Sequence, residues 1–261
     1  MSSIFDSQSW TNFHYTDINA LVNIIREDCI ILRATNCLYL NDSNEIVEGI
    51  KAIQRIMKKA INPASFRNYY LTSFSKVPDQ LNMWGMYASN GNGCAIGLDH
   101  KILSKCYPLY IQCIYGELEI DKHLSSFLNL NRTGCITHIG INHEEEQRKI
   151  NDNIENIRNT LENNLIVSSC LGSKNEAYKN EDEVRYVVNF KDSKYIKFRT
   201  KNGIIIPYIE IRIPKEALRS IIIGPTNKSE LSLQSIVHFL SINKYSLNNI
   251  KLETSQIPYR G

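Results

Sequence analysis

The sequence lacks the cysteine and apolar patterns that mark several common classes of protein. Its seven cysteines are odd in number and no two form a Cys-x-x-Cys pair, which argues against a disulfide framework and against a zinc site. We therefore expect reduced thiols that are mostly buried. Nowhere does the chain approach the ~20 consecutive apolar residues that a membrane-spanning helix requires, so we expect no membrane segment.

The chain also has little excess of one charge over the other. With 30 Lys and Arg residues against 27 Asp and Glu residues, the net charge is only +3. A dedicated nucleic-acid-binding protein usually carries a stronger basic patch, although a briefly bound nucleic-acid substrate remains compatible with this balance. Residues 1–10 show no basic start followed by an apolar run, so we expect no signal peptide and a cytoplasmic location.

The chain does have enough apolar material for a sizeable core. Of its 261 residues, 43% are hydrophobic and 22% are charged, which is close to the globular average. The length is long for one ordinary domain and short for two, and neither a repeat nor a low-complexity linker divides it. We predict a single elaborated domain over residues 1–261, with a helical insertion at about 119–170.

Helical spacing of apolar residues predicts five helices. They lie at about 18–25, 45–59, 80–88, 143–167 and 231–240. Asp17 or Thr16 can cap the first of them by accepting hydrogen bonds from its free N–H groups. The strongest signal is at 143–167, where one apolar face runs along a polar helix. That face could pack on the sheet. Alternatively, it could pack on a second copy of the protein and form a homodimer.

Runs of β-prone residues lie between these helices. They fall at 13–16, 30–32, 69–75, 94–98, 108–115, 184–190, 204–213, 220–223 and 250–254. Strands that cluster, with helices between them and without strict β-α-β alternation, predict an α+β fold. The stretch from 119 to 140 has no clear period, and residues 174–182 form a predicted charged loop.

Two motifs that could suggest ligand binding have simpler interpretations. Gly91-Asn92-Gly93 precedes a strand and lacks the further glycine or lysine of a phosphate-binding loop, so it predicts a turn. His138 and His143, near the glutamates at 144–146, lack the His-Glu-x-x-His spacing, and a carboxylate run at a helix start stabilises the helix dipole by itself. We therefore predict no metal site.

Polar residues at strand ends form the candidate site. His14 lies in a short strand directly before a helix, and Ser73 and Ser75 point to one face of another strand. Glu183 and Arg185 share a face of a third strand. Taken one at a time, these features have equally good structural explanations: Glu183 and Arg185 could form a structural pair, and the serines could be ordinary polar strand residues. Their joint occurrence at strand ends favours a ligand site.

Six segments resemble the bacterial family of domain of unknown function 2971. In chain order they are Phe-His-Tyr-Thr at 13–16, Tyr-Leu-Asn-Asp at 39–42, Leu-Thr-Ser-Phe-Ser at 71–75, Met-Trp-Gly-Met-Tyr-Ala at 83–88, Gly-Cys-Ala-Ile-Gly-Leu-Asp at 93–99 and Glu-Asp-Glu-Val-Arg-Tyr at 181–186. Their order and spacing match over most of the chain. This resemblance identifies a family and implies little about function.

A second resemblance, to ADP-ribosyltransferases, implies chemistry. His14-Tyr15-Thr16 and the helix after it are similar to the His-Gly-Thr segment and helix of poly-ADP-ribose polymerases, although Tyr15 replaces the usual Gly. The strand from Tyr70 to Ser75 is similar to their Tyr-Phe-Ala segment, and Glu183 to the catalytic Glu that heads a hydrophobic strand. Residues 119–170 have no counterpart. The resemblance implies a split, mostly antiparallel sheet with flanking helices, and NAD as the co-substrate.

The same resemblance implies which residues bind NAD. His14, followed by Tyr15 and Thr16, would hydrogen-bond a hydroxyl of the adenosine ribose. Ser73 or Ser75 would hold the nicotinamide amide.

A ring from the chain would stack on the nicotinamide. Tyr70 or Tyr87 would supply it. Trp84, three residues before Tyr87 on a predicted helix, would line the pocket, although this spacing is more often found in a core or pocket wall.

The resemblance assigns catalysis to the acidic residues at the start of the third strand. Glu183 would accept a hydrogen bond from the nicotinamide-ribose 2′-OH and stabilise the positive charge that develops as the glycosidic bond breaks. Glu181 would orient the nucleophile, and Arg185 lies beside Glu183 on the same face.

The expected function is NAD-dependent ADP-ribosyl transfer to a protein or nucleic acid, or NAD hydrolysis. A toxin or phage-defence role is what such bacterial domains often imply. One alternative is a non-catalytic nucleotide or nucleic-acid binding module, in which Glu183 only pairs with Arg185 and basic residues gather on one face. Another is a metal-dependent nuclease, in which Glu181, Asp182 and Glu183 bind Mg²⁺.

Overall fold

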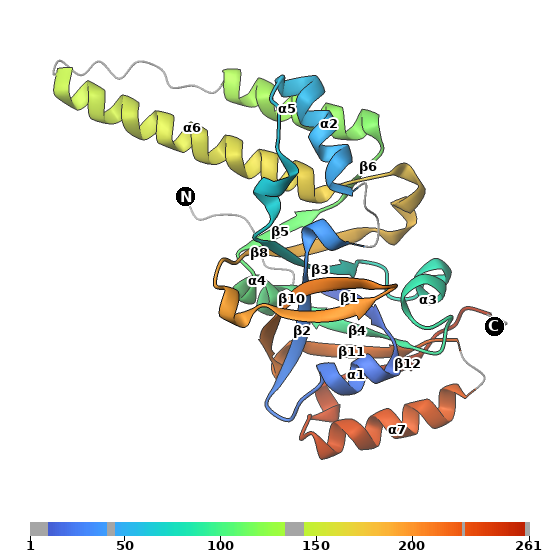
Figure 1. The fold of residues 1–261 in the computed structure, drawn as a ribbon. Helices are drawn as coiled ribbons and strands as arrows, with labels where there is room; N and C mark the ends of the chain where they lie inside the picture. Colours follow the sequence, from blue (N-terminus) through green and yellow to red (C-terminus); the bar gives the residue numbers. More distant parts are fainter. Residues whose placement is uncertain (1–9, 41–44, 134–143, 226–227, 259–261) are drawn as a thin grey trace. The chain divides into compact units, whose positions relative to one another are not determined.

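A computed structural model describes residues 10–40, 45–133, 144–225 and 228–258. The chain divides into two compact units. The first unit comprises residues 1–40, 66–112 and 177–261, and the second comprises residues 41–65 and 113–176. The first is built on a large sheet and the second mainly on helices (Figure 1).

The sheet of the first unit has ten strands. They are β1 (Thr11–Thr16), β2 (Cys29–Asn36), β3 (Tyr69–Ser75), β4 (Cys94–Asp99), β5 (Leu109–Gln112), β8 (Glu183–Asn189), β9 (Lys197–Lys201), β10 (Ile204–Pro214), β11 (Leu218–Ile223) and β12 (Lys251–Thr254). The main order is β12-β11-β4-β1-β3-β2-β10-β9, and β8 joins β3 to β5. Among the described strands of this sheet, only β11 and β12 pair in parallel. The prediction of an α+β fold with a mostly antiparallel sheet is therefore confirmed.

Strand β3 lies at a split in this sheet. Along one edge it pairs with β8 over its whole length. Its other edge is shared, because β2 pairs with it only at Tyr70 and Leu71, while β1 pairs with it only through Phe13 and Ser75. The neighbouring strands therefore separate along the middle of β3.

The two faces of the sheet carry different helices. Alternation along the strands turns Ile30, Leu32 and Ile96 to one side, which we call the core face. Helices α1 (Ile18–Ile24), α4 (His100–Cys106) and α7 (Ser229–Ile242) pack there. Helix α3 (Leu81–Tyr87) contributes Met83 and Trp84 to a smaller apolar cluster on the opposite side, the α3 face.

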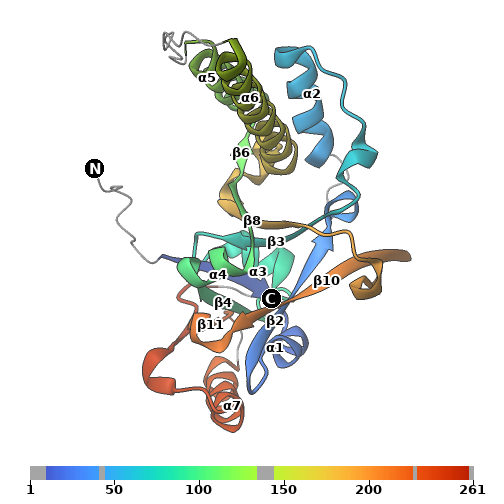
Figure 2. The ribbon, with the colours of Figure 1, turned by 90° about the vertical axis from the view of Figure 1, so that its left-hand side faces the viewer.

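The second unit groups three helices, α2 (Glu45–Met57), α5 (Glu117–Thr133) and α6 (Glu144–Gly172) (Figures 1 and 2). Short strands β6 (Ile114–Tyr115) and β7 (Ser173–Lys174) pair in parallel beside them. Gly49 permits close contact between α2 and α6, since a Cβ there would lie 2.4 Å from the Cα of Cys170. Arg55 of α2 makes two hydrogen bonds to Asp121 of α5, which fixes that pair of helices side by side.

Short 3-10 helices complete the described chain. They are η1 (Cys37–Tyr39), η2 (Pro63–Phe66), η3 (Glu176–Glu181), η4 (Ser193–Tyr195), η5 (Lys215–Ala217) and η6 (Leu247–Asn249). Within the described ranges, no helix is long and apolar enough to cross a membrane. Five of the six cysteines that the structure describes are buried, in keeping with the sequence analysis.

Helix α5 is the main departure from the sequence analysis, which found no period at 119–140. Only Ile120 and Leu124 of its early turns are buried, and two apolar contacts one turn apart give a weak pattern. The helix is fixed instead by packing against α2 within the second unit. Residues 134–143 lie outside the described ranges. The predicted charged loop at 174–182 is largely η3.

Burial of Ile96 gives a direct test of the core. We expect Ile96→Ala to lower the free energy of unfolding by about 2–5 kcal/mol, because it removes a fully buried side chain and leaves a cavity. Ile204→Ala makes the same chemical change at a side chain that is 55% exposed, and should cost less than about 0.5 kcal/mol. Urea unfolding followed by circular dichroism measures both. Equal losses would contradict this placement of the core.

Candidate functional site

The most unusual polar feature of the first unit is a buried ion pair within β8. Arg185 donates from Nε to one carboxylate oxygen of Glu183 at 2.8 Å and from Nη2 to the other at 3.1 Å. The side chains are only 1% and 7% exposed, respectively. They lie on one face because residues two apart on a strand point the same way. Burying such a pair costs desolvation energy, so its geometry must be nearly complete to be tolerated.

The two serines of β3 lie directly across from this pair. Ser73 is the partner of Arg185 and Ser75 the partner of Glu183, so all four side chains share the α3 face. The Ser75 hydroxyl is engaged both as donor and as acceptor, since it donates to the Glu181 carbonyl at 2.7 Å and accepts from the Val77 N–H at 3.0 Å. The Ser73 side chain is partly exposed and makes no hydrogen bond within the described structure.

Helix α3 brings Tyr87 to the same region. Its hydroxyl donates to the carboxylate of Glu181 at 2.8 Å, and Glu181 is itself buried at the end of η3. The Tyr87 ring remains partly exposed. The residues predicted on the acidic segment and on α3 are therefore joined by direct contact.

Tyr15 and Trp84 form the apolar support beneath α3. Their rings meet edge to face at 4.8 Å between centroids, and the Trp84 side chain has no exposed surface. The indole N–H donates to Asp79 at 2.6 Å and the Tyr15 hydroxyl to the Val77 carbonyl at 2.9 Å. Both side chains thus hold the wall of the region in place and offer little surface to a ligand.

His14 lies at the split between β1 and β2. Its Nδ1 is 3.0 Å from the Ser73 carbonyl, which can only accept, so Nδ1 carries the proton. Burial lowers the pKa of His14, and the hydrogen bond to Ser73 opposes that shift less strongly. The neutral ring therefore keeps Nε2 as an acceptor.

The sheet register places His14 apart from the serines. Phe13 is opposite Ser75, so His14 belongs to the core face, as do Thr16 and Tyr70. Tyr70 is 2% exposed within the main core. His14 reaches the middle of β3 only because the split leaves that strand edge unpaired by β1 or β2.

Sequence reasoning missed a polar cluster on the core face. Asn12 donates to the Tyr186 hydroxyl at 2.7 Å, and His100 Nδ1 lies 2.6 Å from that same hydroxyl. Trp10 stacks on the His100 ring at 4.0 Å. These residues come from distant parts of the chain, so no local spacing could have indicated the cluster.

A basic strip was also missed. Arg33, Lys197 and Arg199 share the α3 face of β2, β10 and β9, and Lys197 pairs with Glu210 at 2.7 Å. Arg199 donates to the Thr35 hydroxyl at 3.1 Å. In the described part of the chain, no carboxylate forms an ion pair with Arg33 or Arg199. Burial, together with the nearby charge of Arg33, lowers the pKa of Arg199.

The carboxylates of the acidic segment are engaged with other side chains. Glu181 contacts Tyr87, and Glu183 is clamped by Arg185. Among the residues placed by the structure, no group of three or more His, Cys, Asp or Glu side chains converges to hold a metal ion. His138 and His143 lie outside the described ranges.

The first unit is thus a split antiparallel sheet with a buried Glu-Arg pair beside the split. Residues 83–186 match the model of the family described as Protein of unknown function (DUF2971). That match includes three of the six segments, at 83–88, 93–99 and 181–186, and supports the family resemblance drawn from the sequence motifs. No curated protein and no solved structure matches the chain.

The buried pair predicts an asymmetric response to mutation. Arg185→Ala should lower the free energy of unfolding by about 3–5 kcal/mol, because it leaves the Glu183 carboxylate buried without its main partner. Arg212→Ala breaks an exposed ion pair to Asp28 and should cost only a small fraction of that. Chemical denaturation measures both variants. A loss at Arg212 as large as at Arg185 would contradict the burial argument.

The lowered pKa of His14 predicts a pH dependence. A histidine whose pKa is lower in the folded state stabilises the fold fully above its unfolded value of about 6.5. That contribution is lost as the pH falls through the unfolded and then the folded pKa, because the unfolded chain binds the proton more tightly. His14→Gln should therefore flatten part of the fall in stability between pH 7 and pH 5. NMR titration of the ring should show a midpoint below that of free histidine, and a midpoint above it would contradict the assignment.

Proposed function

We propose that the first unit binds NAD and transfers its ADP-ribosyl group to a macromolecule or to water. One observation carries the proposal. Three residues of the expected site converge on the short segment Ser73–Ser75 of β3: His14 bonds the Ser73 carbonyl, Arg185 is opposite Ser73, and Glu183 is opposite Ser75. Neighbouring strands lie ~4.8 Å apart, so His14 on the core face and Glu183 on the α3 face are about two strand spacings apart, and a ligand that contacts both has to pass β3 where β1 and β2 separate.

The contacts favour particular residues where the sequence left alternatives. Ser73 is better suited than Ser75 to hold the nicotinamide amide, since the Ser75 O–H already donates to the Glu181 carbonyl and its oxygen accepts from the Val77 N–H. Tyr87 is better suited than Tyr70 to stack on the ring, because Tyr70 is in the main core. Trp84 and Tyr15 then support Tyr87 without touching NAD.

The roles of Glu183 and His14 follow from the hydrogen bonds that each can accept. Both oxygens of Glu183 accept from Arg185, which holds the carboxylate as a fixed negative charge, and we assign this carboxylate to the ribose 2′-OH. Nε2 of the neutral His14 ring can accept from the other ribose. The bond from ribose C1′ to nicotinamide breaks with its electron pair going to nicotinamide, and the acceptor oxygen then bonds C1′ and loses its proton. Glu183 stabilises the positive charge on the ribose in between.

Nicotinamide release tests this proposal. Purified protein with NAD, alone and with cell lysate as a source of acceptor, should release nicotinamide. Glu183→Gln should lower kcat by about 10²–10³-fold, because it removes a fixed charge from the transition state. Glu210→Gln, at an ion pair on the basic strip, is the matched control and should retain activity. No turnover, together with no NAD binding by calorimetry, would overturn the proposal.

A second candidate function is non-catalytic binding of nucleotides or nucleic acid. The observation that favours it is the basic strip, where Arg33 and Arg199 lack carboxylate partners among the described residues. Guanidinium groups suit phosphate oxygens because their planar N–H groups match that geometry. In this case the Glu183–Arg185 pair is purely structural.

Fluorescence anisotropy with labelled oligonucleotides separates this candidate from the first. Arg33→Ala and Arg199→Ala should each weaken binding and reduce its dependence on salt, because each removes a phosphate contact. Arg26→Ala removes an exposed arginine away from the strip and serves as the control. Binding that is equally sensitive to Arg26→Ala would contradict a site on the strip.

A further inference from the structure

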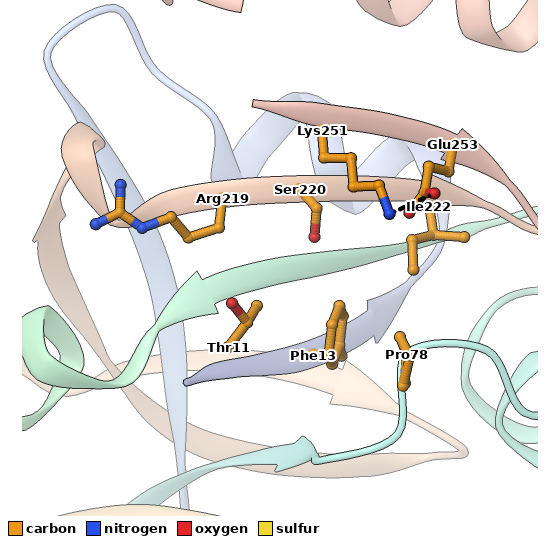
Figure 3. Close-up of a pocket in the computed structure, with 8 residues that line it drawn as sticks. All are labelled: Thr11, Phe13, Pro78, Arg219, Ser220, Ile222, Lys251 and Glu253. Atoms are coloured by element: carbon orange, nitrogen blue, oxygen red, sulfur yellow. Dashed lines mark ion pairs between the residues drawn. The ribbon is translucent and has the colours of Figure 1, made fainter. Parts of the chain in front are cut away.

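A groove crosses the α3 face on the far side of β1 from Glu183 (Figure 3). It has a volume of about 280 Å³, just below the ~300 Å³ at which pockets for larger ligands begin. Phe13, Pro78 and Ile222 form its apolar walls. Phe13 is also the β1 residue paired with Ser75, so the groove begins about two strand spacings, or ~10 Å, from Glu183.

The floor of this groove depends on Gly97 of β4. Ser220 of β11 is paired with Gly97, and a Cβ at position 97 would lie 2.2 Å from the Ser220 Oγ and 2.8 Å from the Thr11 Cγ2. A side chain at position 97 would therefore displace both. Glycine lets the Ser220 and Thr11 side chains from neighbouring strands lie low over the sheet, which keeps the groove open above them.

Two hydroxyl groups in the groove have no hydrogen-bond partner within the described ranges. They belong to Thr11 and Ser220, and Ser220 is only 7% exposed. Neither hydroxyl oxygen is among the fully buried polar atoms that lack a partner, so both open into the groove, where water or a ligand can bond them. In Figure 3 the two side chains extend from opposite sides toward the space over β4. They could both bond one polar edge of a ligand.

The charged side chains at the rim are already paired with each other or with the sheet. Arg219 makes two hydrogen bonds to the buried carboxylate of Asp99, at 2.8 and 3.1 Å. Lys251 pairs with Glu253 at 2.7 Å. The groove therefore presents hydroxyl groups and apolar walls with little net charge. That combination suits a neutral ring better than a phosphate or a carboxylate.

We propose that this groove binds a neutral planar heteroaromatic ring, with Ser220 and Thr11 bonding its polar edge and Phe13, Pro78 and Ile222 covering its apolar surface. The choice of a nucleobase or a pyridine carboxamide as that ring rests on the proposed function. The groove is on the same sheet face as Glu183, and adenine and nicotinamide are the two rings that NAD carries. The ring site itself requires no catalysis.

Adenosine and nicotinamide, each added to the full chain, are the probes. Saturation-transfer NMR detects binding and calorimetry measures Kd. Binding of either probe supports the site and identifies the ring class. Ser220→Ala should weaken it about three- to tenfold through loss of one hydrogen bond. Binding of neither probe would overturn the proposal, whatever the outcome for nicotinamide release from NAD.

A bulky variant locates the binding. Thr11→Phe should fill the groove and weaken binding at least tenfold, whereas Thr200→Phe, at an exposed position on the edge strand β9, should leave the Kd unchanged. Binding that survives Thr11→Phe would show that the ring sits elsewhere and would overturn the proposal.

Discussion

The pairing of β3 is the constraint on which the candidate site depends. One edge of this strand is occupied by β8 from end to end, while the other is divided between β2 at its start and β1 at its end. Full pairing fixes Ser73 and Ser75 against Arg185 and Glu183. Divided pairing leaves the Ser73 carbonyl open to the His14 ring. A shift of one residue in either register would move these side chains to the opposite face.

The α3 face offers two kinds of binding surface, one charged and one neutral. Beside the split, the buried carboxylate of Glu183 and guanidinium of Arg185 are joined by two hydrogen bonds. Removing either side chain is costly because the other charge would stay buried without this partner. Further along the same face, Arg33 and Arg199 stand without carboxylate partners in the described structure. Over Gly97, by contrast, the rim charges are paired and the interior offers hydroxyl groups. An elongated ligand with ionic and neutral parts would meet both kinds of surface on one side of the sheet.

Much of the fold could be predicted from local patterns. The β-prone runs at 69–75 and 94–98 and the helical stripe of α2 identify elements that the structure forms. The serines and the Glu-Arg pair could also be assigned to common faces, since that needs only the two-residue period of a strand.

Long-range register could not be predicted in this way. Asn12 bonds Tyr186 across 174 residues of sequence, and no local spacing indicates such a contact. The separation of His14 from Ser75 onto different faces follows from a single pairing of Phe13 with Ser75. Helix α5 could not be predicted because its burial is set by packing against α2. The groove could not be predicted because the pairing of Ser220 with Gly97 follows a register shift between Leu218 and Ser220.

A crystal structure with a non-hydrolysable NAD analogue tests the central claim most directly, since the claim concerns which side chains meet around β3. One ribose hydroxyl should lie within hydrogen-bonding distance of Nε2 of His14 and another within that distance of the Glu183 carboxylate, with the ligand passing β3 beside Ser73, where β1 and β2 separate. An analogue bound away from β3, or an unoccupied structure at saturating analogue concentration, would contradict it.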